Sequence, residues 1–248
     1  DMNISGLSGT YKIDTFSAIS ISLKSMNWGQ WSNTLNQSPV QLNDFNFNAA
    51  YSRKLSDKLS AGIVLKYTKT TSLDSLLNKH KGFGLAGDVA IYYNDQTKIR
   101  GKELVYAAGI SLSNIGNKLS YDTSTFRRSL PENLGAGVAG YYNLNDKNNL
   151  GLLIDVNATG QGLLTNPHVD KLTWSIVLEY TYSNTFFLRS GYYRVNAISN
   201  LSSRYGFTGG LGIRYNDIIF DFGYVIKEDV NGYFSNSLIE NKPMFSLG

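Results

Sequence analysis

The chain has 248 residues, of which 42% are hydrophobic and only 17% charged, and its formal net charge is +4. Soluble domains carry roughly 25% charged residues, and 17 Tyr, 12 Phe and 24 Gly against 4 Pro favour strands over helices. The lack of cysteine excludes disulfides and thiol chemistry. The basic residues are scattered, which argues against nucleic-acid binding, and no segment reaches the roughly 20 apolar residues of a membrane helix.

Apolar and polar residues alternate along the chain in about twelve segments of roughly 9–13 residues. Side chains of a strand alternate between its two faces, so each segment has one apolar face. Ordinary strands average about 5–6 residues, whereas a tilted membrane strand needs about 9–11, and these segments fit the longer class. In chain order, the clearest apolar series are Ile19–Leu23, Ile63–Tyr67, Leu104–Leu112, Leu150–Val156, Leu172–Tyr180 and Ile218–Ile226.

Short polar turns alternate with longer loops between these segments. The short turns fall at 14–15, 54–58, 143–147, 183–185 and 215–217, with 93–102 as a longer member of the series. The longer loops fall near 28–43, 72–82, 116–131, 159–170, 196–204 and 227–241. This order predicts an all-β fold, an up-and-down antiparallel transmembrane β-barrel with short periplasmic turns and long outer loops. A soluble sandwich with Greek-key connections would not sort its loops in this way.

Tyrosines recur at the short-turn ends of the predicted strands. A ring of amphipathic side chains at one height is typical of a membrane–water interface. We therefore predict an aromatic girdle formed by Tyr11, Tyr51, Tyr93, Tyr142, Tyr182 and Tyr215.

The opposite strand faces carry charged residues, as Asp221 between Phe220 and Phe222 illustrates. A charge on the lipid face of a barrel costs up to about 2–4 kcal/mol at mid-bilayer, so these side chains are expected to face the lumen. A soluble lipocalin-like barrel would need the opposite sense, with apolar faces inward. The predicted lumen-facing charges are Lys24, Lys66, Asp88, Asp155, Glu179, Arg189, Arg214 and Asp221.

The ends of the chain do not complete a barrel. The segment 241–248 is predicted to be a thirteenth strand that is cut short, whereas bacterial single-chain barrels have even strand counts. The chain also begins within a strand pattern and shows no signal peptide, as a mature fragment would. We expect residues 1–248 to form a single barrel domain with about 12–13 of about 14 strands, lacking an N-terminal segment and the closing end.

Three stretches resemble the PorV family of the type IX secretion system: "NDFNFNAAYSRKLSDKLSAGIVLKY" at 43–67, "YAAGISLSNIGNKLSY" at 106–121 and "LPENLGAGVAGYYNLNDKNNLGLLIDVN" at 130–157. The resemblance implies a FadL-type barrel of fourteen strands in the outer membrane, in contact with lipid and lipopolysaccharide. It implies a non-enzymatic carrier without a cofactor. Such a carrier binds the C-terminal β-domain of secreted cargo at the SprA translocon and escorts it to the surface attachment and sortase complex. From the loop 28–42 we can quote no stretch that resembles the family.

Cargo or partner binding is expected on the long outer loops, because loops on a rigid scaffold carry function. The candidates are Trp31, Leu73, Leu76, Leu77, Arg127 and Arg128. The segment 72–81 could form one or two helical turns with its leucines on one face, which would cap the mouth, pack on a partner or cover its own loop. The arginines could contact acidic cargo or lipopolysaccharide phosphate, or lie in a solvated loop.

Three other functions stay open. A FadL-type channel for hydrophobic small molecules would need an apolar lumen pocket, and a PorQ-like role would differ only in the loops. A lipopolysaccharide deacylase would need a triad, for which His80 or His168 with Ser72 or Ser75 and Asp170 are the available residues. Two histidines without cysteine give no metal-ligand spacing, so no metal site is expected.

Overall fold

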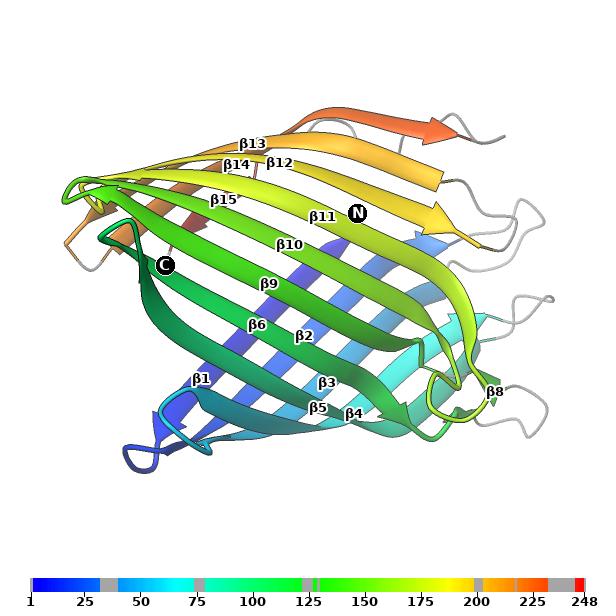
Figure 1. Ribbon diagram of the computed structural model, residues 1–248. Coiled ribbons are helices and arrows are strands. Elements are labelled where there is room, and N and C mark those ends of the chain that lie inside the picture. Colours follow the sequence, from blue (N-terminus) through cyan, green and yellow to red (C-terminus); the bar gives the residue numbers. More distant parts are fainter. Residues whose placement is uncertain are drawn as a thin grey trace. The chain divides into compact units, whose positions relative to one another are not determined.

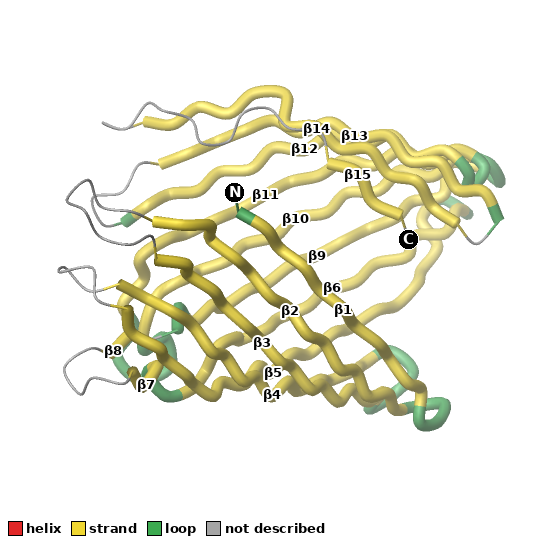
Figure 2. The backbone as a smooth tube through the Cα atoms, turned by 180° about the vertical axis from the view of Figure 1, so that it is seen from behind, coloured by secondary structure: helices red, strands yellow, loops and turns green. Residues whose placement is uncertain are grey.

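The computed structural model describes residues 2–31, 40–73, 79–121, 127–128, 130–198, 203–216, 218–231 and 244–247. Every regular element in these ranges is a β-strand, which confirms the predicted all-β class (Figures 1 and 2). No helix in these ranges is long and apolar enough to cross a membrane.

Thirteen strands follow one another in a single hydrogen-bonded order, β1 to β6 and then β9 to β15. The pairs β1–β2, β2–β3 and β10–β11 are antiparallel. This up-and-down order confirms the prediction of about 12–13 strands. The strands are β1 (Asn3–Lys12), β2 (Ser17–Trp31), β3 (Val40–Lys54), β4 (Leu59–Leu73), β5 (Lys79–Ile99), β6 (Lys102–Gly116), β9 (Glu132–Asn145), β10 (Asn148–Gln161), β11 (His168–Tyr182), β12 (Phe186–Ala197), β13 (Ser203–Tyr215), β14 (Ile218–Asn231) and β15 (Met244–Leu247).

Two further short strands, β7 (Leu119–Tyr121) and β8 (Arg127–Arg128), lie off this path. The chain divides into two compact units. Unit 1 consists of Asp1–Ile91 and Ser111–Glu132, and unit 2 of Tyr92–Ile110 and Asn133–Gly248. Strands β5 and β6 contribute residues to both.

The turns between consecutive strands are as short as the sequence predicts, with one correction. The segment 93–102 is not a longer turn, because β5 continues to Ile99 and β6 begins at Lys102. Only Arg100 and Gly101 connect them, with φ angles of 54° and 78°. Two successive residues in the left-handed region are the signature of a type I′ hairpin turn. The polar residues before it extend the strand beyond its apolar part.

In unit 1 the register aligns the apolar positions of neighbouring strands on one face. Tyr11 pairs with Ile19, Ile19 with Tyr51, and Tyr51 with Ile63. One row further from the short turns, Ile21 pairs with Ala49, which pairs with Leu65. The other face is polar, and its neighbouring strands are joined by hydrogen bonds from Asn48 to Ser22 and from Thr68 to Asn46 at 3.0 and 2.7 Å.

Unit 2 repeats this separation of faces. Leu188 pairs with Tyr180 on one side and Leu211 on the other, and Leu211 pairs with Phe222. Next to this apolar row runs a polar row in which Glu179 pairs with Arg189 and Arg189 with Gly210.

The apolar faces are exposed. Leu65 is 70% exposed, Leu188 55% and Phe220 55%, and no large side chain among the described residues is fully buried. A continuous apolar surface of this kind marks an interaction surface in water. The buried described hydrophobics are Ala86, Leu112, Leu119 and Phe187. Few of the described apolar side chains are therefore removed from solvent by packing inside the protein. The apolar faces need an apolar environment outside it.

Candidate functional site

The polar face of unit 2 contains an ion cluster centred on Arg189 of β12. Its Nε donates to Glu179 Oε2 of β11 at 2.6 Å, and its Nη1 donates to Asp221 Oδ1 of β14. Glu179 is 14% exposed, and Arg189 and Asp221 are 33% exposed each. One guanidinium therefore joins three strands across the polar face, with both of its charge-assisted contacts in a partly desolvated setting.

Glycines of the intervening strand β13 make this reach possible. Arg189 pairs directly with Gly210, and Gly212 pairs with Asp221. A Cβ at Gly212 would collide with the Asp221 carboxylate and lie 3.2 Å from Phe187 Cβ. The absence of side chains at Gly210 and Gly212 thus leaves the path that Arg189 follows to β14.

The buried ring of Phe187 supports the same cluster. The guanidinium carbons of Arg189 and Arg214 both lie 5.2 Å from its centroid. A cation over an aromatic face gains from the ring quadrupole. Phe187 was not identified from the sequence, because its partners depend on strand register.

The polar face of unit 1 has its own network. Lys66 Nζ of β4 lies 2.7 Å from Asp88 Oδ2 of β5 and donates to Asn114 Oδ1 of β6 at 2.9 Å. The backbone N–H of Asn114 donates to Asp88 Oδ1 at 2.8 Å. Asn114 has a φ of 61°, the left-handed conformation that Asn tolerates better than most residues. The network therefore fixes an irregular point in β6.

This irregular point leads the chain from β6 into β7. The Asn114 amide also donates to the Pro131 carbonyl at 2.9 Å, which ties the two ends of the segment 115–130 together. β7 pairs with β5 through Gly82↔Tyr121 and Phe83↔Ser120. The bare Gly82 faces the Tyr121 ring, which lies 2.6 Å from where a Cβ would stand. Part of the predicted loop 116–131 is therefore strand.

The predicted partner-binding residues were expected in loops, but those that the structure describes lie in strands. Trp31 ends β2, Leu73 ends β4, and Arg127 and Arg128 form β8, where they pair with Ser120 and Leu119. A search for alternating apolar residues underestimates the length of such strands, because their outer ends are polar and show no alternation. Residues 72–73 and 79–81 are strand and not helical turns, and Leu76 and Leu77 lie outside the described residues.

All eight predicted lumen-facing charges lie on the polar faces. In unit 1, Lys24 pairs with Asn46, in the row next to Lys66 and Asn48. In unit 2, Asp155 pairs with Ser175, and Arg214 with Ile219. The cluster members Asp88, Glu179, Arg189 and Asp221 complete the set. Which solvent these faces meet stays a prediction at this point.

Five of the tyrosines predicted as a girdle lie within three residues of a short-turn strand end, whereas Tyr93 lies six residues before the end of β5 at Ile99. Tyr11 and Tyr51 share one cross-strand row through Ile19. In unit 2, Tyr93 and Tyr106 both donate to Asp95, at 3.1 and 3.2 Å, and Tyr142 donates to the Ile99 carbonyl at 3.2 Å. Tyr182 and Tyr215 end β11 and β13 and are 42% and 70% exposed. Their role as a girdle stays a prediction.

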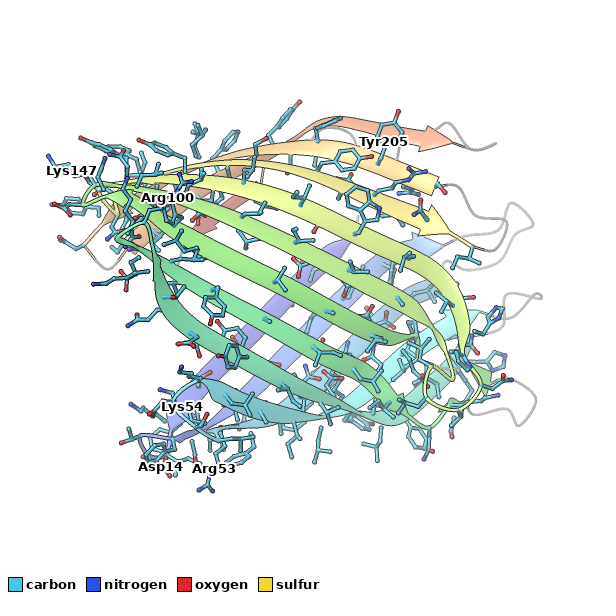
Figure 3. All side chains as sticks on the ribbon, in the orientation of Figure 1. Asp14, Arg53, Lys54, Arg100, Lys147 and Tyr205 are labelled. Carbon is cyan, nitrogen blue, oxygen red and sulfur yellow. The ribbon has the colours of Figure 1, made fainter. Side chains whose placement is uncertain are left out.

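A second aromatic group at the other end of unit 2 was missed. Tyr192 lies at ring-centroid distances of 5.2 Å from Trp174 and 5.0 Å from Phe207, and 6.4 Å from Tyr205. Figure 3 shows Tyr205 at the end of the strands opposite to Arg100 and Lys147. The group could have been predicted from the sequence, because aromatic residues recur near the ends of the strands that lead into the long loops.

The residues considered for catalysis are only partly described. His168 Nε2 lies 3.3 Å from Asp170 Oδ1 at the start of β11, whereas the side chains of Ser72 and Ser75 lie outside the described residues. Within the described ranges, no three His, Asp or Glu side chains gather as a metal-binding group.

A family model described as "Type IX secretion system protein PorV" matches residues 1–168. The chain belongs to the PorV family. The match covers the Lys66–Asp88–Asn114 network and ends before the Arg189 cluster. No curated protein matches the sequence significantly.

Solved structures similar to the chain share little sequence identity with it. A Pseudomonas aeruginosa FadL homologue is 12% identical, with 91% of this chain and 69% of that chain covered and a TM-score of 0.49. The Pseudomonas putida toluene transporter TodX is 13% identical over 91% and 80%, with a TM-score of 0.49. The CymD monoaromatic hydrocarbon channel is 10% identical over 92% and 81%, with a TM-score of 0.45.

As a PorV family member, the chain is an outer-membrane β-barrel component of type IX secretion. The lipid-facing surface of such a barrel is an apolar band and its interior is polar. The prediction that the exposed apolar faces meet lipid and that the ion clusters of Arg189 and Lys66 face the lumen fits this arrangement and stays a prediction.

Proposed function

We propose that this protein is a non-enzymatic cargo carrier of type IX secretion that crosses the outer membrane many times. It binds the C-terminal β-domain of secreted proteins at a SprA-like translocon and passes them to the surface attachment and sortase complex. The observation that carries the proposal is the PorV family match over residues 1–168.

The described geometry supports a rigid wall that presents its long-loop end to other proteins. Ion clusters tie β4, β5 and β6 in unit 1 and β11, β12 and β14 in unit 2. The segment after β6 is held against β5 by β7, which places the Arg127–Arg128 strand β8 on an ordered support. Function on segments held by a rigid scaffold is the usual arrangement in binding proteins.

The test is purification of the tagged full-length protein from its own envelope in mild detergent, followed by mass spectrometry. We expect a very large translocon barrel and secreted proteins that share a C-terminal β-domain. A lone barrel that carries fatty acids or similar lipids would contradict the carrier and support the FadL-type channel.

A charge-reversal pair locates the cargo-binding end. We expect Arg127→Glu with Arg128→Glu to reduce cargo recovery several-fold, because the reversal replaces attraction to an acidic partner by repulsion. The matched control reverses Arg53 and Lys54, an adjacent basic pair at the short-turn end of β3 (Figure 3). Equal loss in both variants would contradict the placement of cargo binding at the long-loop end, without affecting the carrier function itself.

A further inference from the structure

The missed aromatic group of unit 2 surrounds an arginine on the apolar face. Arg194 of β12 pairs with Trp174 of β11 and with Tyr205 of β13. It is exposed, and it lies two positions from Tyr192, on the same strand face. A cation on the lipid-facing side of a membrane strand is costly unless it lies at the interface.

The height of Arg194 can be worked out from the register. The apolar row nearest the short turn contains Phe186, which pairs with Tyr182. Eight residue steps separate Phe186 from Arg194, which is about 27 Å along a strand and about 20 Å along the membrane normal at a tilt near 40°. The apolar band of an outer-membrane barrel is about 25 Å tall, so Arg194 lies near its far edge. Because the short turns are periplasmic, this edge is the outer leaflet.

The guanidinium of Arg194 is held in place by a neutral neighbour, because its Nε donates to Asn196 Oδ1 at 2.8 Å. Among the side chains that the structure describes, which do not include those of residues 226–231, Arg194 has no carboxylate partner. The two Nη groups remain as a planar fork, the geometry that binds phosphate through two parallel hydrogen bonds. The backbone register pairs Phe207 with Lys227 and Tyr205 with Asp229 of β14.

We infer that Arg194, with Asn196 and the aromatic residues Trp174, Tyr192 and Tyr205, forms a binding site for the phosphorylated head group of an outer-leaflet glycolipid. The aromatic rings lie against the upper acyl chains and the sugar, as amphipathic rings do at membrane interfaces. The guanidinium fork binds the phosphate. This site lies on the lipid face, and it does not depend on the proposed cargo-carrying function.

The test is native mass spectrometry of the full-length protein, released from detergent micelles that contain bisphosphorylated lipid A. We expect Arg194→Gln to weaken lipid A retention about tenfold or more, since a hydrogen bond to a charged group contributes at least about that factor. Arg194→Lys, which keeps the charge but loses the fork, should lie between this variant and the wild type. Heat-modifiable gel mobility confirms that each variant is folded.

The matched control is Arg204→Gln. Arg204 pairs with Val195, one position from Arg194 at the same end of unit 2, and is also exposed but lies on the polar face. It should retain lipid A like the wild type, and dephosphorylated lipid A should not distinguish Arg194→Gln from the wild type. Equal weakening by both glutamine variants, or unchanged retention by Arg194→Gln, would overturn the site. Displacement of lipid A by millimolar inorganic phosphate would show a free-anion site and would also overturn it.

Discussion

Removal of Arg189 is the most direct perturbation of the polar face of unit 2. Arg189→Met keeps an unbranched apolar side chain but removes the guanidinium, and with it the bonds to Glu179 and Asp221 and the contact with the Phe187 ring. The two carboxylates then lie on the same face without the cation between them. Glu179 is only 14% exposed, so water compensates for the loss incompletely.

Two limits bracket the size of the effect. Exposed ion pairs contribute about 0–1 kcal/mol, whereas the loss of one partner from a buried pair costs about 3–5 kcal/mol. Arg189 and Asp221 are each 33% exposed and Glu179 is less so, which places the cluster between these limits. We therefore expect Arg189→Met to lower the free energy of unfolding by about 2–3 kcal/mol.

Arg214→Met is the matched control. Arg214 also lies 5.2 Å from the Phe187 centroid, but it has no carboxylate partner among the described residues. Its loss should cost only about 0.5–1 kcal/mol, the usual contribution of an exposed cation–π contact. The difference between the two variants isolates the carboxylate contacts.

The assay is reversible urea unfolding of the full-length protein in phospholipid vesicles, followed by tryptophan fluorescence and heat-modifiable gel mobility. An Arg189→Met variant with the same midpoint as Arg214→Met would refute the argument that the cluster stabilises the wall. A double-mutant cycle of Arg189→Met with Asp221→Asn should give a coupling of about 1 kcal/mol, as contacting residues do.

Two further predictions concern unit 1. Gly116→Ala should destabilise the protein by about 1–3 kcal/mol, because a Cβ there would overlap the rigid Leu85 carbonyl, whereas Gly9→Ala, with nothing within 4 Å, should be nearly neutral; urea midpoints of the two variants check this. The backbone hydrogen bond from Phe16 lowers the pKa of Asp14 from its ordinary value. The carboxylate therefore stabilises the folded turn at pH values above the pKa that Asp14 has in the unfolded chain. This contribution is lost as the pH falls through the lower pKa of the folded protein. Asp14→Ala should therefore lose stability at pH 6 and converge with the wild type in acid; a difference that grew on acidification would contradict the sign.

Strand positions were predictable from the sequence because they follow from a local pattern. Alternation fixes which residues share a face, and the apolar row Leu188, Leu211 and Phe222 is the one expected from that period. The sequence predicted a longer turn at 93–102 instead of the two-residue turn at Arg100–Gly101. The reason is that β5 continues through polar residues that show no alternation.

Contacts that depend on register or tertiary pairing were not predictable. The charges on the polar faces were identified, but the partners of Arg189 follow from the alignment of β12 with Gly210 and of Gly212 with Asp221. Likewise β7 forms because it pairs with β5. Its three residues are too few to show an alternating pattern from which a strand could be predicted. The φ of 61° at Asn114 is set by bonds to residues distant in sequence.

The Arg189 cluster also bears on the choice between a carrier and a channel. A hydrophobic solute passing along this face would displace water from Glu179, Arg189 and Asp221 without replacing its hydrogen bonds. Desolvation of polar groups without compensation costs about 1–3 kcal/mol per group, and the cost is larger for charges. A carrier that binds protein at its loop end needs no apolar path across the membrane, so a charged and cross-linked polar face is compatible with it. The face of unit 2 that was expected to line the lumen therefore favours the carrier on energetic grounds.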